Sequence, residues 1–163
     1  MLNLHIVPFH RSYNREAFCS QSPELNHYLQ RQVSQDIKRN ITSCFLALTD
    51  DEQIAGYYTL SAYSIAFDEL SPDIQKKLPH YPQLPALLMG RLATDSRYLG
   101  QGVGKSLLLS ALHRAKRLEV ASFALLVEAK NQQAINFYQH FGFTAFQSTN
   151  DKLYYPLSLF QAK

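Results

Sequence analysis

Cysteine is scarce in this 163-residue sequence, and its two cysteines, Cys19 and Cys44, form no Cys-x-x-Cys motif. That excludes a disulfide framework and favours a reduced cytoplasmic setting, with both thiols as small buried apolar groups. The six histidines show no metal-ligand spacing with the cysteines. We therefore expect no bound metal.

Long apolar runs are also missing, because no run approaches the length that spans a bilayer. The first residues lack the charged-then-apolar pattern of a signal peptide, so we expect neither export nor a membrane segment. Hydrophobic residues make up 46% and charged residues 18% of the chain, as in soluble globular proteins. The length and the absence of a linker-like stretch predict one domain over residues 1–163.

Glycine is sparse, yet three of the six glycines, Gly100, Gly102 and Gly104, alternate within one short stretch. This stretch follows an apolar strand-like run and opens into an amphipathic helix. Glycines let a ligand approach the backbone closely, and a helix N-terminus offers unpaired N–H groups and a positive dipole end. The stretch therefore predicts a site for a phosphate-bearing ligand, whereas the plain alternative is a glycine-rich turn.

Spacing separates three glycine motifs that compete for this stretch. A Walker A loop would need a glycine where Leu99 stands, and a dinucleotide fingerprint would need one where Lys105 stands, so both fail. The pattern Arg/Gln-x-x-Gly-x-Gly/Ala is matched in full by Arg97, Gly100 and Gly102. It resembles the diphosphate loop of the GNAT acyltransferases, whose donor is acetyl-coenzyme A.

A second motif lies about one helix downstream, at residues 131–143. Phe137, Tyr138 and Phe141 recur at helical spacing there, and Gly142 falls where a helix C-cap is expected. Taken alone, the pattern favours Phe137 and Phe141 as core residues with Tyr138 as their neighbour. In the order strand, loop, helix, strand, helix, the two motifs together resemble the GNAT core.

The resemblance extends to residues 18–29, 56–61 and 90–95, and covers roughly positions 5 to 160. These segments are similar to one branch of the family, the acetyltransferase toxins of type II toxin–antitoxin modules. One departure is Gln21, which stands where those toxins often carry a glycine. The resemblance implies an α/β GNAT fold: a mixed central sheet of six to seven strands splayed into a V and flanked by about four helices.

The resemblance also implies a site. The loop amides would hold the diphosphate, the Leu92–Thr94 strand would pair with the pantetheine arm, and Asn131 would contact that arm. An amide of Leu92 or Ala93 would polarise the thioester carbonyl, and Tyr138 would be the general acid. The expected coenzyme-binding residues are Leu92, Ala93, Thr94, Arg97, Gly100, Gln101, Gly102, Val103, Gly104, Lys105 and Asn131.

The acceptor amine would attack the thioester directly, because Cys19 and Cys44 lie outside the coenzyme motifs and lack the signature of an activated thiol. No general base is identified. An α-amine has a pKa of about 8 against about 10.4 for lysine, which favours an α-amine acceptor. For toxins of this branch the acceptor is aminoacyl-tRNA, and its acetylation blocks translation.

The partners implied are aminoacyl-tRNA, a ribbon–helix–helix antitoxin and a second copy in a homodimer. Two alternatives remain: acetylation of a small-molecule or protein amine, and a non-catalytic module that binds coenzyme A. The net charge of +3 is low for a nucleic-acid-binding domain. Residues 71–117 nevertheless carry eight Lys/Arg and only two Asp/Glu. Apart from binding the coenzyme phosphates, this excess of positive charge would bind tRNA phosphates. Alternatively, it would interact with the dipole at a helix C-terminus near Arg114, Lys116 and Arg117.

Hydrophobic periodicity and turn residues predict a continuous α/β chain. Ser22 and Pro23 form a strong helix start, and we expect that helix to end near Arg39. A long helix over residues 102–116 should bury Leu107, Leu108, Ala111, Leu112 and Ala115. The other expected elements are strands at 4–9, 42–48, 54–65, 87–94, 122–128, 143–146 and 153–159, a short helix at 72–77 and a proline-rich loop at 79–85.

Overall fold

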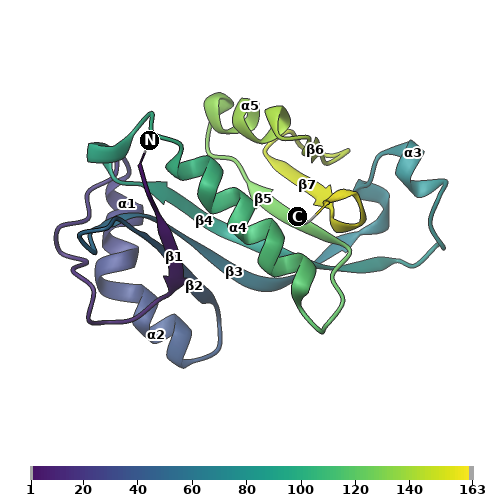
Figure 1. Ribbon diagram of the computed structural model, residues 1–163. Helices are drawn as coiled ribbons and strands as arrows, with labels where there is room; N and C mark the ends of the chain where they lie inside the picture. The colour runs from purple at the N-terminus through teal and green to yellow at the C-terminus, as the bar shows by residue number, and fades with distance from the viewer. Residues whose placement is uncertain (1, 162–163) are drawn as a thin grey trace. The chain divides into compact units, whose positions relative to one another are not determined.

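The computed structural model describes residues 2–161, and its elements follow the predicted order (Figure 1). Contacts group the chain into two compact units. One comprises the chain through Ser61 together with Gly90–Ala111, and the other comprises Ala62–Met89 together with the chain from Leu112 onward. The prediction of a single domain over 1–163 stays a prediction.

The described part of the chain contains seven strands, four helical elements and three short 3₁₀ turns. The strands are β1 (His5–Pro8), β2 (Ser43–Leu48), β3 (Ile54–Ala66), β4 (Gln83–Thr94), β5 (Ala124–Glu128), β6 (Thr144–Ala145) and β7 (Lys152–Pro156). The helices are α1 (Pro23–His27), α2 (Val33–Lys38), α3 (Pro72–Gln75), α4 (Val103–Arg117) and α5 (Gln132–His140), with α1 and α2 joined by a π-helical turn, Tyr28–Gln32, into one element.

The strands form one sheet in the order β1-β2-β3-β4-β5-β7-β6. The pairs β1–β2, β2–β3, β5–β7 and β7–β6 are antiparallel, whereas β4 and β5 are parallel. The parallel pair joins Ala86–Met89 to Ala124–Val127, and β4 continues to Thr94. The predicted mixed sheet is confirmed.

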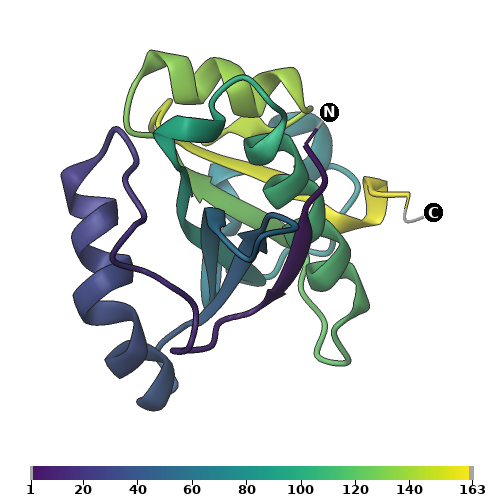
Figure 2. The same cartoon turned by 60° about the vertical axis from the view of Figure 1, so that its left-hand side comes forward.

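The first helix begins where its sequence predicts. The Ser22 side chain accepts a hydrogen bond from the Leu25 amide at 3.3 Å, and Pro23 occupies the first turn, where its missing N–H costs nothing. One buried cluster joins this helix to residues of β2 and β3, and its helical members are Leu25, Tyr28, Leu29 and Val33. Figure 2 shows the helix beside these strands. The π-helical turn was not predicted.

Three expectations were wrong in detail. The loop expected at 79–85 ends earlier, because β4 already begins at Gln83 and the Pro85 carbonyl accepts a hydrogen bond from the Phe123 amide at 2.8 Å. The last strand ends at Pro156, and a 3₁₀ turn over Leu157–Leu159 replaces its expected continuation. Only one thiol is buried: burial raises the pKa of Cys44 to about 12, whereas Cys19 is exposed.

The predicted inward face of α4 is confirmed, since its five expected core residues are all buried. No helix in residues 2–161 has both the length and the apolarity needed to cross a membrane. Within the same residues, no three His, Cys, Asp or Glu side chains are grouped to hold a metal ion. The expected absence of a metal remains a prediction.

Candidate active site

The glycine loop is the last part of the connection between β4 and α4. Its backbone has the conformation that its glycines favour. Gly100 has φ +75° and Gly102 has φ +82°, in the left-handed region that strongly favours glycine. A Cβ at either position would meet no atom within 4 Å, so both glycines border open space. Gly104 instead lies in the first turn of α4. The loop therefore presents exposed backbone beside the N-terminus of a long helix, the geometry that suits an anion.

Asp95 organises the entry to this loop, and sequence analysis gave it no role. It caps a 3₁₀ turn, Ser96–Tyr98, and only 1% of its surface is exposed. Its carboxylate accepts hydrogen bonds from the Arg97 amide at 2.9 Å, from Arg97 Nε at 2.9 Å and from Arg97 Nη2 at 3.1 Å. Arg97, expected to contact the coenzyme, is therefore held by Asp95 in this structure.

The Asp95 carboxylate is ionised despite its burial. Burial would raise the pKa of Asp95, but hydrogen bonds from the Arg97 side chain and from the Cys19 and Arg97 amides outweigh it and lower the pKa below its usual value. The same pairing raises the pKa of Arg97. The ion pair is therefore a fixed feature at neutral pH.

A cleft of about 170 Å³ opens at the end of β4. Leu92, Ala93 and Thr94, the strand residues expected to face the coenzyme arm, line it. The remaining lining residues are Ser20, Gln21, Ser22, Leu25 and Leu99. None of these five was predicted from the sequence to line a site, although residues 18–29 carried part of the family resemblance. Gln21, the departure from the toxin pattern, is among them.

Gly56 on β3 explains how α4 and β4 come so close at this cleft. A Cβ on Gly56 would lie 2.7 Å from the Ala93 carbonyl oxygen, 2.8 Å from Leu107 Cδ1 and 2.9 Å from Val103 Cγ1. Two of these neighbours are residues proposed for coenzyme binding. Only a residue without a side chain fits between them.

Gly56→Ala should therefore destabilise the protein. Because a backbone oxygen is the nearest atom, the strands must shift, and we expect a loss of about 1–3 kcal/mol in the free energy of unfolding. Urea denaturation measures it. Ala62→Ser, an exposed change on the same strand, is the control and should stay within about 0.5 kcal/mol. A urea midpoint of Gly56→Ala equal to that of the wild type would contradict this close packing around Gly56.

The second motif forms α5 and its flanks. The side-chain oxygen of Asn131 caps the helix by accepting a hydrogen bond from the Ala134 amide at 2.9 Å. Gly142 follows the helix with φ +92°, as a C-cap glycine should. The expected Asn131 contact with the pantetheine arm would use the other end of its amide group, and it stays a prediction.

Tyr138 is the buried aromatic residue of α5, with 5% of its surface exposed, whereas Phe137 and Phe141 are half-buried. This reverses the plain interpretation of the stripe, in which the two phenylalanines were core. The ring of Tyr138 packs against Phe137 and Phe143 at centroid distances of 5.3 and 5.5 Å. Burial raises the pKa of its phenol, which therefore keeps its proton at physiological pH.

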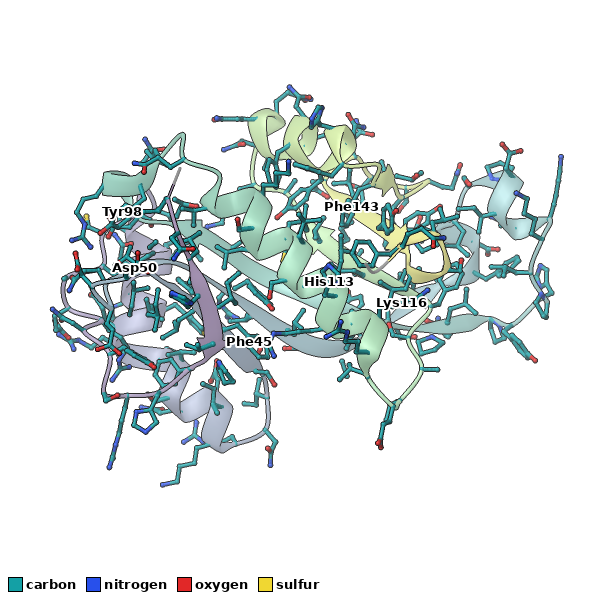
Figure 3. All side chains as sticks on the ribbon, in the orientation of Figure 1. Phe45, Asp50, Tyr98, His113, Lys116 and Phe143 are labelled. Carbon is teal, nitrogen blue, oxygen red and sulfur yellow. The ribbon has the colours of Figure 1, made fainter. Side chains whose placement is uncertain are left out.

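The basic end of α4 has a structural contact. Lys116 Nζ donates a hydrogen bond to the Leu157 carbonyl at 2.8 Å, and the His113 ring packs edge-on against Phe160 (Figure 3). These contacts tie the segment after β7 to the helix. For Lys116, this supports a structural use of its charge over a role in binding nucleic-acid phosphates.

The loop, the cleft at the end of β4 and the capped α5 helix are the parts expected of an acyl-CoA-dependent enzyme. The chain matches the model of the Acetyltransferase (GNAT) family over residues 7–143. It therefore belongs to this family and is an acyltransferase with the α/β GNAT fold.

Known proteins are similar to this chain over nearly its whole length. A tRNA-acetylating toxin of Mycobacterium tuberculosis is 29% identical over 149 residues, 90% of this chain and 87% of that protein. The structure of AtaT complexed with acetyl-methionyl-tRNAfMet is 29% identical, with a TM-score of 0.88 and coverage of 96% of both chains. The crystal structure of AtaTR bound with AcCoA is 29% identical, with a TM-score of 0.79, and covers 95% of this chain and 94% of that one.

Proposed function

We propose that this protein is an acetyl-CoA-dependent N-acetyltransferase toxin that acetylates the α-amino group of aminoacyl-tRNA and so blocks translation. One observation carries the catalytic part: the left-handed Gly100–Gly102 backbone opens into α4 next to a cleft lined by the end of β4. The toxin part rests on the similarity to a tRNA-acetylating toxin and to AtaT along nearly the whole chain.

The coenzyme is proposed to bind through backbone groups more than through side chains. Amides from Gln101 to Lys105 would hold the diphosphate at the N-terminus of α4, where the helix dipole favours negative charge. The Lys105 ammonium and the Arg97 guanidinium would add charge. The edge of β4 from Leu92 to Thr94 would pair with the amide-rich pantetheine arm as a further strand does.

The chemistry is proposed as a direct transfer. The neutral acceptor amine forms a bond to the thioester carbon, and the carbonyl oxygen gains negative charge that an amide of Leu92 or Ala93 stabilises. When the C–S bond breaks, the sulfur takes the phenolic proton of Tyr138 and leaves as the thiol. The acetylated nitrogen releases one proton to solvent, and the Tyr138 phenolate takes one proton from solvent, which restores the phenol. No base is assigned, because an α-amine is appreciably neutral at physiological pH.

The pH profile should carry the signature of this chemistry. The rate should rise through the acceptor pKa of about 8 as the amine loses its proton. It should not fall again by about pH 9, because the raised pKa of Tyr138 keeps the acid protonated there. Initial rates from about pH 6 to pH 9, corrected for hydrolysis of the aminoacyl ester, measure the profile. A descending limb in this range would contradict Tyr138 as the acid.

The partners follow from the toxin assignment. A small antitoxin of the ribbon–helix–helix type would cover the site and bind DNA, and the enzyme would act as a homodimer. Expression alone should arrest growth, and co-expression with the product of an adjacent antitoxin reading frame should restore it.

The acceptor is tested by acetyl transfer in vitro. Purified protein is given radiolabelled acetyl-CoA with charged tRNA, with uncharged tRNA, or with free polyamines and peptides. We expect label on charged tRNA alone. Label on the free amines and none on tRNA would instead assign a small-molecule or protein acceptor, and failure to bind acetyl-CoA by calorimetry would leave only a non-catalytic module.

A further inference from the structure

One side of the cleft at the end of β4 is a short irregular segment. Ser20, Gln21 and Ser22 line the cleft and precede α1; we call these three residues the acceptor wall. Ser20 makes an isolated antiparallel bridge with Asp95, and the other two belong to no helix or strand. Such a segment keeps its position only if other groups hold it.

Asp95 holds the acceptor wall from the side of β4. Its Oδ2 accepts a hydrogen bond from the Cys19 amide at 2.9 Å, and the Ser96 amide donates to the Cys19 carbonyl at 2.9 Å. Both backbone polar groups of Cys19, the residue before the wall, are thereby bonded to the two residues that follow β4. Hydrogen bonds to a buried carboxylate are stronger than those between neutral groups.

The same carboxylate holds the beginning of the coenzyme loop. The three bonds from Arg97, one from its amide and two from its guanidinium, leave Asp95 with four donors in all. One buried charge therefore fixes two segments that lie 76 positions apart in the sequence.

Asn26 on α1 also holds the acceptor wall. Its Oδ1 accepts hydrogen bonds from the Ser20 amide at 2.8 Å and from Ser20 Oγ at 2.7 Å, and its Nδ2 donates to the Ser20 carbonyl at 3.2 Å. Ser20 is buried, so these bonds are shielded from water. The Asp95 and Asn26 side chains thus both hold the wall, and Asp95 also bonds to Arg97 at the start of the loop.

We propose that Asp95 is a positioning residue that sets the acceptor wall against the end of β4, so that the bound acceptor presents its amine to the thioester. This rests on the proposed acetyl transfer. A loosened wall would hold the acceptor less tightly, so its KM would rise, and would also misplace its amine, where a shift of about 1 Å in a reacting group can cost about 10²-fold in rate. The KM for the acceptor should therefore change more than the affinity for the coenzyme.

Asp95→Asn tests the proposal because it keeps the size of the side chain but removes the charge and part of the accepting capacity. We expect the KM for charged tRNA to rise about tenfold or more, with a smaller change in acetyl-CoA affinity. Arg97→Ala should do the reverse, because it removes coenzyme-side charge and keeps the hydrogen bond that the Cys19 amide donates to Asp95. Asp51→Asn, at an exposed turn, is the control and should match the wild type.

Asn26→Ala provides a second route that does not touch the loop. It removes the hydrogen bonds that hold the wall to α1, so it too should raise the KM for charged tRNA. If Asp95→Asn does not fold, Asn26→Ala alone tests whether the wall positions the acceptor. Equal shifts of acceptor KM and coenzyme affinity, or an unchanged acceptor KM, in these variants would overturn the proposal. Wild-type protein that does not acetylate charged tRNA would instead refute the proposed function itself.

Discussion

Replacing Tyr138 with phenylalanine should lower turnover by about 10²–10⁴-fold, the range typical of a lost general acid. The change removes a single oxygen and keeps the ring, whose contacts with Phe137 and Phe143 fill the buried side of α5. The affinity for acetyl-CoA should therefore stay nearly unchanged. Single-turnover rates give the first quantity and calorimetry gives the second. In cells, the variant should no longer arrest growth.

Tyr155→Phe is the matched control for that experiment. Tyr155 lies in the same unit and its ring also contacts Phe143, but its hydroxyl makes only a 3.4 Å hydrogen bond to the Leu159 carbonyl. This variant should retain near wild-type turnover. Wild-type rates in Tyr138→Phe would remove Tyr138 from the mechanism and leave solvent as the proton source for the departing sulfur.

The double replacement Gly100→Ala with Gly102→Ala should weaken acetyl-CoA binding by roughly 30- to 1000-fold. Each alanine would have to adopt a φ of +75° or +82°, at about 1–2 kcal/mol per position, and the loop would relax to avoid this strain. If the relaxation moves the amides away from the diphosphate, the strain appears as lost affinity, at about 1.4 kcal/mol per tenfold. Calorimetry with acetyl-CoA measures it.

Gly142→Ala separates this effect from a general loss of stability. Gly142 has the comparable φ of +92°, but it follows the C-cap of α5 and is not part of the loop. It should lower the free energy of unfolding while leaving acetyl-CoA affinity close to that of the wild type. Equal losses of affinity in the two variants would mean that the loop acts only through folding.

The loop and α5 could be predicted because their chemistry is local. A left-handed backbone favours glycine, a helix start favours a cap such as Ser22, and a helix end favours a residue such as Gly142. A few consecutive residues meet each of these requirements, so they can be recognised in the sequence. The family resemblance then supplied the roles of Tyr138 and Asn131, which spacing alone left open.

The acceptor wall could not be predicted, because it depends on contacts between distant parts of the chain. Nothing near Asp95 in the sequence indicates that one of its partners is the Cys19 amide, 76 positions away. The exposure of Cys19 was missed for the same reason. The π-helical turn at Tyr28–Gln32 likewise has no local signal, since its residues suit an ordinary helix.

The position of the acetyl group on the product tests the central claim most directly. Charged tRNA is treated with the enzyme and acetyl-CoA, the terminal aminoacyl-adenosine is released by nuclease, and its fragments are read by mass spectrometry. The proposed function predicts one acetyl group on the α-nitrogen of the amino acid and none on the nucleoside. An acetyl group on the adenosine, or an unmodified α-amine after full incubation with active enzyme, would contradict it.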